Sequence, residues 1–421
     1  MGDIFMKLMK SLFSSEFLFA FFLLSSTAKL AVDEWVPVDL TLIFMVLSIV
    51  AAIKVTFKNK GVPKKIVLPA ILYSFLCLIM LISLFYTPSS SYAITKTLKF
   101  MFLTGWSFFG GFLVIRNRQS LRKFLKSFAG ITILVSGIVI WNYYNSPVQE
   151  ELNRLGVDGG SVLGLAKMTA MGSIIVLILY FYGAAKKRVR FFLTGVLGLL
   201  LIALLLTGSR MALIAFVLTL FFIAILSIKF SINDIKIKKS VFKFIPLIPL
   251  ALVGLIPLYR NGTIDTLLMR MQFLFNEQGA ANSISERINR YNTSIHMFEN
   301  DIFKGGGIGS FAIKYSGLDE RHYPHNMFLE FMSELGIFGI ATFLTLLIAA
   351  VWCVISTIRT QVIAPEQISV ILLLVFQLFN VNTTGDFNDN RIFFAFLGLT
   401  FMIGSYKMID KSNDYMESIN E

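Results

Sequence analysis

Twelve apolar stretches of near-bilayer length dominate this sequence. A transmembrane helix needs about 20 consecutive, mostly apolar residues. Such stretches occur at 13–32, 38–57, 66–86, 94–115, 124–145, 161–183, 190–207, 211–229, 241–258, 327–357, 367–381 and 392–408. The tenth is longer than a span requires, so it is expected to tilt or to project, and the eleventh is short. The pattern predicts an all-α polytopic membrane protein, with residues 1–421 forming one membrane domain of about 12 transmembrane helices.

The composition fits a membrane protein and argues against an ordinary soluble domain. Of the 421 residues, 56% are hydrophobic and 15% are charged, whereas soluble domains carry about 25% charged residues. The formal net charge of +13 would suggest a nucleic-acid partner in a soluble protein. Here the basic residues lie mostly beside apolar stretches, so orientation in the bilayer explains them, and no nucleic acid is expected as a partner.

The distribution of Lys and Arg over the loops predicts the orientation. With the N-terminus in the cytoplasm, the inner loops are rich in basic residues: Lys58, Lys60, Lys64 and Lys65; Arg116, Arg118, Arg122, Lys123 and Lys126; Lys186, Lys187, Arg188 and Arg190; Lys229, Lys236, Lys238, Lys239 and Lys243. The outer loops at 33–37, 87–91, 146–160 and 380–390 contain a single basic residue, Arg154. Basic loops stay in the cytoplasm, so both termini are expected inside, with 409–421 as a cytoplasmic tail.

This orientation places residues 259–326 outside, as one large loop that faces the periplasm or the cell exterior. Within it, apolar residues recur at helical spacing at Ile284, Ile288, Tyr291, Ile295 and Phe298. That spacing predicts an amphipathic helix lying over the bundle.

Arginines mark two places on the expected outer face. Arg210 ends the sequence Thr207-Gly-Ser-Arg210 and opens an apolar helix. An arginine at membrane depth is costly, so it either snorkels to the surface or serves a function. The adjacent Ser209 and the backbone donors of the helix N-terminus favour an anion such as phosphate. Arg287 and Arg290 lie on the outer-loop helix, where simple solvation is the alternative to a binding role.

A glycine-rich segment from Lys304 to Phe311 is the third place. It lacks the Gly-Lys-Ser/Thr ending of a nucleotide-binding loop and is expected outside the cell, away from ATP. Its glycines are therefore interpreted as residues that permit a tight turn.

The fourth place is the pair His325-Asn326 with Glu330 and Glu334. The two glutamates are four residues apart and share one helix face, which must look into a protein or water cavity rather than lipid. Histidine is suited to proton transfer near neutral pH, so His325 is the candidate base. His322 is a rival.

Metal binding has little support in the sequence. The three histidines, of which His296 looks peripheral, show no zinc-ligand spacing, and no carboxylate cluster of the calcium type is evident. No metal or other cofactor is expected. Asp386 and Asp389 in the last outer loop could hold a cation or a sugar, although solvation is the favoured interpretation.

Three motifs resemble the O-antigen ligase and polymerase superfamily, the Wzy/WaaL-type membrane glycosyltransferases. The first is Thr207-Gly-Ser-Arg210. The second is Arg287 with Tyr291, followed by Asp301-Ile-Phe-Lys-Gly305 and Gly307-Ile-Gly309-Ser-Phe311. The third is His325-Asn-Met-Phe-Leu-Glu330, followed by Glu334-Leu-Gly336 and Gly339. The resemblance is specific over about 195–345, and it departs at Ile302, where the family commonly has proline.

The resemblance implies a GT-C-like bundle in the bacterial cytoplasmic (inner) membrane, with a metal-independent, inverting glycosyl transfer on its outer face. The donor would be a glycan on undecaprenyl pyrophosphate. His325 would be the general base, and Arg210 and Arg287 would bind the pyrophosphate. A chain-length regulator or another polysaccharide-assembly membrane protein would be a partner. Residues expected to contact substrate or shape its cavity are Arg290, Asn326, Glu330, Glu334 and Ser209.

Two reactions share such a site. A polymerase joins lipid-linked repeat units, whereas a ligase moves the glycan onto lipid A core or another acceptor. The sequence around His325 resembles capsule and O-unit polymerases more than enteric ligases, so polymerisation is favoured by analogy. A polyprenyl-linked glycan flippase is the alternative from another class. It is disfavoured because the polar residues concentrate at one face and the two halves show no symmetry.

Overall fold

The structure is a computed structural model that describes residues 14–32, 38–59, 61–145, 162–182, 187–230, 235–237, 277–383 and 385–406. Its helices are α2 (Ser15–Val32), α3 (Leu40–Lys58), α4 (Val67–Ser83), α5 (Ser91–Lys99), α6 (Gly105–Val114), α7 (Arg118–Asn145), α8 (Val162–Tyr182), α9 (Lys187–Leu206), α10 (Arg210–Ser227), α13 (Glu277–Asn300), α14 (Ser310–Ser316), α15 (Met327–Thr360), α16 (Pro365–Val381) and α17 (Arg391–Phe401). A π-helical turn, Phe100–Thr104, joins α5 to α6. Short 3₁₀ turns lie at Lys64–Ile66 and Ile403–Ser405.

The helices coincide with the predicted spans wherever the structure describes the chain. The predicted span at 241–258 and the predicted tail at 409–421 lie outside the described residues. Seven described helical segments are long and apolar enough to cross a membrane: Leu40–Lys58, Lys64–Ser83, Ser91–Val114, Arg118–Trp141, Val162–Tyr182, Lys187–Leu206 and Met327–Thr360. The predominantly helical, polytopic membrane fold is therefore supported. One small departure is an antiparallel pair of three-residue strands, β1 (Ile228–Phe230) and β2 (Ile235–Ile237).

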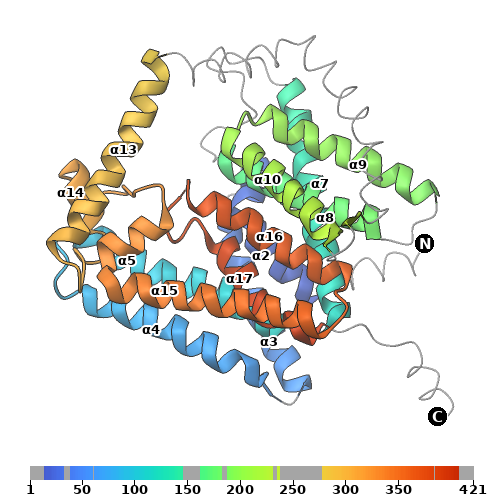
Figure 1. Ribbon diagram of the computed structural model, residues 1–421, viewed down its shortest axis with the longest axis horizontal. Helices are drawn as coiled ribbons and strands as arrows, with labels where there is room; N and C mark the ends of the chain where they lie inside the picture. Colours follow the sequence, from blue (N-terminus) through green and yellow to red (C-terminus); the bar gives the residue numbers. More distant parts are fainter. Residues whose placement is uncertain are drawn as a thin grey trace.

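The helices pack as a bundle with α17 and α2 near its middle (Figure 1). α2 contacts α3 and α7, α6 packs on α17, and α15 packs on α4 and α13. An aromatic core joins these elements: the fully buried ring of Tyr73 stacks on Phe100 and Phe108, with ring centroids 5.2 and 4.8 Å away. The Tyr73 hydroxyl donates to the Phe100 carbonyl in the π-helical turn, at 2.8 Å.

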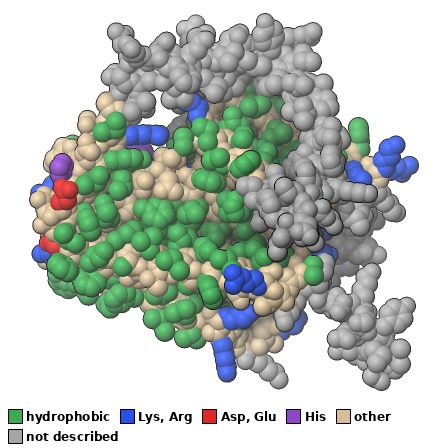
Figure 2. All heavy atoms as spheres, in the orientation of Figure 1, with side chains coloured by type: hydrophobic (Ala, Val, Ile, Leu, Met, Phe, Trp, Pro, Cys, Tyr) green, Lys and Arg blue, Asp and Glu red, His purple; other side chains and the backbone are tan. Residues whose placement is uncertain are grey.

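The outside of the bundle is also apolar. On α3 and α4, side chains such as Val46, Ile53 and Ile71 are at least half exposed. Figure 2 shows apolar side chains spread over much of one face of the molecule. Exposed apolar surface of this extent suits contact with lipid rather than water.

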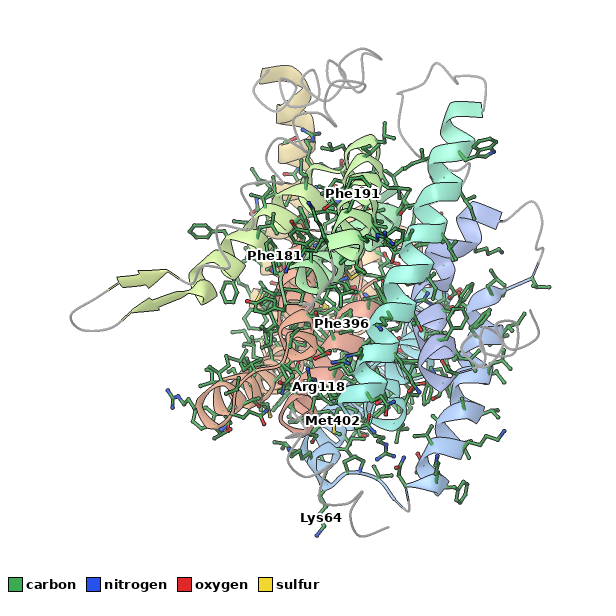
Figure 3. The ribbon with its side chains drawn as sticks, turned by 90° about the vertical axis from the view of Figure 1, so that its right-hand side faces the viewer. Lys64, Arg118, Phe181, Phe191, Phe396 and Met402 are labelled. Atoms are coloured by element: carbon green, nitrogen blue, oxygen red, sulfur yellow. The ribbon has the colours of Figure 1, made fainter. Side chains whose placement is uncertain are left out.

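Lys64, in the turn between α3 and α4, lies at the lower edge of the molecule in Figure 3, and the tan helix α13 rises at its upper edge.

A break in α15 shapes the α13 end. Gly336 has φ 62° and ψ −158°, which interrupts the helix. The N–H of Ile337 consequently donates to the carbonyl of Ile302 (2.8 Å) rather than to that of Ser333 four residues earlier. The Ser333 carbonyl accepts instead from the N–H of Gly306, at 2.9 Å. The glycine-rich loop thus takes the place of the missing helical hydrogen bonds.

Candidate functional site

His325 lies in a loop that delivers it directly to the start of α15. Its φ of 62° makes it the one non-glycine residue with a positive φ in the described part of the chain. Such a backbone costs about 1–3 kcal/mol and is concentrated at functional sites. The next residue, Asn326, caps α15: its side-chain oxygen accepts from the N–H groups of Phe328 (3.0 Å) and Leu329 (3.2 Å). The expected contact of Asn326 with substrate stays a prediction.

The surroundings of His325 keep its imidazole neutral. Partial burial, followed by the positive charges of Arg290 and Arg287, lowers the pKa of His325 to about 4, against the opposing charge of Glu286. The ring of Tyr323 meets the imidazole edge-on, with centroids 4.6 Å apart. A histidine that is neutral at physiological pH can accept a proton, as a general base must.

Arg290 attaches α13 to the loop that carries His325. It is 8% exposed, and its guanidinium donates to the Tyr323 carbonyl (3.0 Å) and to Glu286 (2.7 and 3.3 Å). It also lies 4.4 Å above the ring centre of Tyr315. The hydrogen bond from Arg290, followed by the positive charge of its guanidinium, holds the pKa of Glu286 below its ordinary value.

Arg287 lies one helical turn earlier and remains partly exposed. Within the described part of the chain it makes no ion pair, and it is near enough to His325 to lower the pKa of the imidazole. The structure therefore brings together His325, Arg287 and Arg290. The helix itself was predicted, but the face that packs was not: Ile288 and Ile295 are exposed, whereas Arg290 is buried. The contacts to the His325 loop explain this, because they require a polar face.

Arg210 begins α10, as predicted, and is partly buried. Gly208 has φ 60°, which allows the sharp turn between α9 and α10. Thr207 is buried and bonds the Leu204 carbonyl at 2.6 Å, while Ser209 is 9% exposed. α10 packs on α16 and α8, whereas Arg290 of α13 contacts Tyr323 and Glu286. That Arg210 and Ser209 share one site with His325 stays a prediction.

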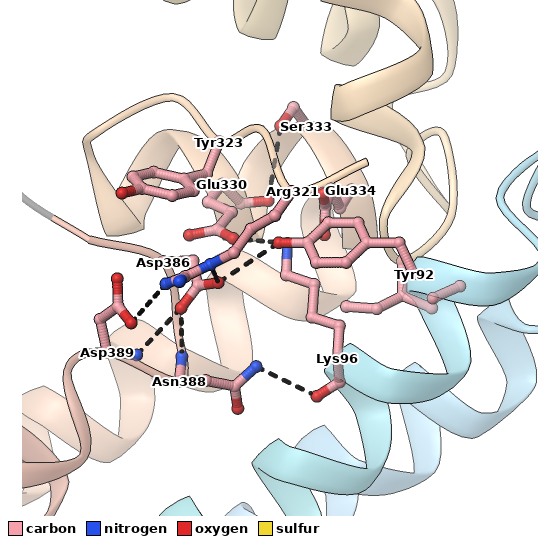
Figure 4. Close-up of polar contacts among 12 residues, drawn as sticks. Tyr92, Lys96, Arg321, Tyr323, Glu330, Ser333, Glu334, Asp386, Asn388 and Asp389 are labelled. Carbon is pink, nitrogen blue, oxygen red and sulfur yellow. Dashed lines mark hydrogen bonds and ion pairs between the residues drawn. The ribbon is translucent and has the colours of Figure 1, made fainter. Parts of the chain in front are cut away.

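Glu330 and Glu334 face the protein interior, as their shared helix face predicted. Both carboxyl groups are fully buried, and both lie against Lys96 of α5, whose Nζ is 2.5 Å from Glu330 and 2.7 Å from Glu334 (Figure 4). Lys96 is not among the site residues predicted from the sequence. A signal was present, because a lysine inside the apolar stretch 94–115 is costly unless it is paired. Contact of the two glutamates with substrate stays a prediction.

The loop between α16 and α17 is joined to the segment before His325 by ion pairs. Arg321 bonds Asp386 at 3.3 Å and also pairs with Asp389 (Figure 4). Although burial opposes it, the two carboxylates raise the pKa of Arg321. Solvation, the interpretation favoured from sequence, is wrong for Asp386: it is 2% exposed and also accepts from the N–H groups of Asn388 and Asp389 at 2.9 Å.

The glycine-rich loop does more than turn the chain. A Cβ on Gly305 would lie 2.6 Å from the nitrogen of Gly336, and a Cβ on Gly336 would lie 2.3 Å from the Phe303 oxygen. The N–H of Gly307 donates to the Glu334 carbonyl at 2.9 Å. These glycines therefore permit the close approach of two backbones, which the interpretation as turn-formers did not include.

The other histidines differ from His325. His296 is exposed on α13 and bonds Glu299 at 3.1 Å, so its expected peripheral place is confirmed. His322 is partly buried, with its ring 6.1 Å from that of Tyr315. His325 lies near enough to Arg290 and Arg287 for their positive charges to lower the pKa of its imidazole.

Comparison with known proteins supports the resemblance seen in the motifs. Residues 195–344 match the model of the protein family described as O-antigen ligase. The matched region runs from α9 to the middle of α15, and so includes Arg210, Arg287, His325 and the two buried glutamates. A search of curated proteins finds no match. Residues 195–344 are thus similar to the O-antigen ligase family, and this match supports a likeness to the O-antigen ligase/polymerase superfamily.

Proposed function

We propose that this protein is a glycosyltransferase at the outer face of the bacterial cytoplasmic membrane that polymerises glycan repeat units carried on undecaprenyl pyrophosphate. The observation that carries the proposal is a neutral His325 beside Arg287 and Arg290. It supplies a proton acceptor next to cations that suit a pyrophosphate. The proposal includes about twelve spans, both termini inside and 259–326 outside.

In the proposed reaction, His325 removes the proton from an acceptor hydroxyl. The resulting oxygen attacks the anomeric carbon of the donor as the bond between that carbon and the pyrophosphate oxygen breaks. A single displacement of this kind inverts the anomeric configuration. The electron pair leaves on the pyrophosphate, whose negative charge is stabilised by Arg287 and Arg210.

Two features support a lipid-linked donor in this proposal. Its activated bond removes the need for a nucleotide outside the cell, and Arg groups can neutralise the leaving pyrophosphate without a metal. The approach of a negatively charged donor would also raise the pKa of His325. The base would then become stronger when the substrate is bound.

The experiment is reconstitution of the purified protein with an undecaprenyl-pyrophosphate repeat unit and no lipid A. A ladder of longer glycans supports a polymerase. The description of the matched family favours a ligase as the second candidate, and a reaction that begins only when lipid A core is added would support it. Accelerated lipid translocation without any transfer would overturn both in favour of a flippase.

Two alanine variants test the site in the same assay. His325→Ala and Arg210→Ala should abolish extension while the protein still inserts. Matched controls are His296→Ala, at an exposed histidine of α13, and Arg190→Ala, at an exposed arginine of α9. Normal product from the two site variants at matched expression would refute the assignment.

A further inference from the structure

The buried contact between α5 and α15 has an unbalanced charge. Lys96 is 1% exposed, and Glu330 and Glu334 are fully buried. The Nζ of Lys96 lies 2.5 Å from the carboxyl group of Glu330 and 2.7 Å from that of Glu334. One ammonium group therefore faces two carboxyl groups. A buried charge without a counter-charge is unstable, so this cluster needs one more positive charge.

The neighbouring groups do not supply that charge. Tyr92 and Phe387 contribute their rings, 5.5 and 4.5 Å from the Lys96 Nζ. The Tyr92 hydroxyl lies 3.3 Å from Asp386, which adds a further negative charge. Among the described residues, the guanidinium of Arg321 is already shared between Asp386 and Asp389 (Figure 4), and the ammonium group of Lys167 donates to Asn390 at 3.4 Å. Tyr323 of the loop before α15 is neutral.

The carboxyl oxygens that point away from Lys96 also lack partners. Glu330 Oε2 and Glu334 Oε1 are buried and accept no hydrogen bond within the described residues. Two carboxylates at close quarters cannot both stay ionised, and one proton shared between them removes the excess charge. A proton is also small enough to enter a close-packed contact.

We propose that Lys96, Glu330 and Glu334 form a buried triad that holds one shared proton, and that Lys96 is a positioning residue for His325. The positioning role of Lys96 rests on the proposed function, whereas the shared proton does not. Both glutamates lie on the segment of α15 between its cap at Asn326 and its break at Gly336. Lys96 therefore fixes to α5 the short helical segment that His325 precedes.

Infrared spectroscopy tests the shared proton without any assay of transfer. At neutral pH the wild-type protein should show the carbonyl band of a buried, protonated carboxyl group. Glu330→Gln and Glu334→Gln should each lose it, because the remaining ion pair with Lys96 is balanced. A band that is absent from the wild type, or that persists in both variants, overturns the shared proton.

Lysine variants test the positioning role. Lys96→Met should lower the unfolding temperature in detergent, and below that temperature it should lower kcat with little change in KM for the donor. Lys99→Met is the matched control, because Lys99 lies on the same helix and is exposed. Adding Glu330→Gln and Glu334→Gln to Lys96→Met removes the three charged groups of the triad and should restore the unfolding temperature.

Two outcomes would overturn the positioning role: Lys96→Met behaving like Lys99→Met, or a rise in KM alone. If the proposed function fails, no variant will show transfer, yet the infrared band and the unfolding temperatures will still report on the triad. The two failures are thus distinguishable.

Discussion

The guanidinium of Arg290 donates a hydrogen bond of 3.0 Å to the carbonyl of Tyr323, two residues before His325. This contact joins α13, which carries Arg287, to the loop that carries the candidate base. The arrangement makes the position of His325 depend on a helix that begins almost fifty residues earlier in the chain.

Replacement of Arg290 by lysine should lower glycan extension about tenfold or more, since a 1.36 kcal/mol rise in the barrier is already tenfold. Lysine keeps the charge but cannot bond Tyr323 and Glu286 and lie over Tyr315 together. The measurement is the initial extension rate at matched protein level. Arg190→Lys, at the exposed start of α9, is the control. An Arg290→Lys rate equal to that of the control would show that charge alone matters there.

The kcat/KM of glycan extension should stay constant to an unusually low pH before it falls on the acid side. The pKa of His325 is lowered to about 4, so in the free enzyme the base stays neutral down to that pH, and kcat/KM should fall only as the pH drops through it. Arg287→Gln removes one of the charges that lower this pKa, so the limit should move to higher pH. A limit near 6.5, the ordinary histidine value, in both proteins would contradict the assignment.

Gly336→Ala should destabilise the protein strongly. The positive φ alone costs about 1–3 kcal/mol, and the added Cβ would lie 2.3 Å from the Phe303 oxygen. Thermal unfolding in detergent measures the effect. Gly137→Ala is the control, because that glycine lies inside α7 with open space around it, and it should be neutral or stabilising. Equal unfolding temperatures for the two variants would argue against the docked loop.

The two carboxylates that bind Arg321 should contribute unequally. Asp389 is partly exposed, and an exposed ion pair contributes about 0–1 kcal/mol. Asp386 is buried, and loss of one partner from a buried pair costs about 3–5 kcal/mol. Unfolding of Asp386→Ala and Asp389→Ala, each with and without Arg321→Ala, gives the two coupling energies. A larger coupling for Asp389 would contradict the burial argument.

Much of the fold could be predicted from the sequence because the bilayer restricts the choices. Apolar stretches of spanning length had to be helices, and α15 begins at Met327, where the apolar stretch 327–357 was predicted to begin. A helix over Ile284–Phe298 was also predicted from its periodicity, and α13 includes this segment. The face on which it packs was wrong, because the contacts of Arg290 outweigh the exposure of Ile288 and Ile295.

The pairings across the chain could not be predicted. Lys96 and Glu334 are 238 residues apart, and no local pattern relates them. Each residue alone signals an interior polar contact, since a charge that faces lipid is unstable, but the partner depends on how α5 meets α15. The pairing of Arg321 with Asp386 could not be predicted for the same reason. Asp386 was expected to be solvated and is instead buried.

The interlocked backbones of Gly305 and Gly336 have a consequence for how such sequences can diverge. Each glycine occupies the space that a side chain on the other would require, and the carbonyl of Ser333 depends on the N–H of Gly306. The loop and the interrupted helix are thus expected to change together. A homologue that lost either glycine would be expected to have lost its counterpart as well, and to have rebuilt α15 as an uninterrupted rod.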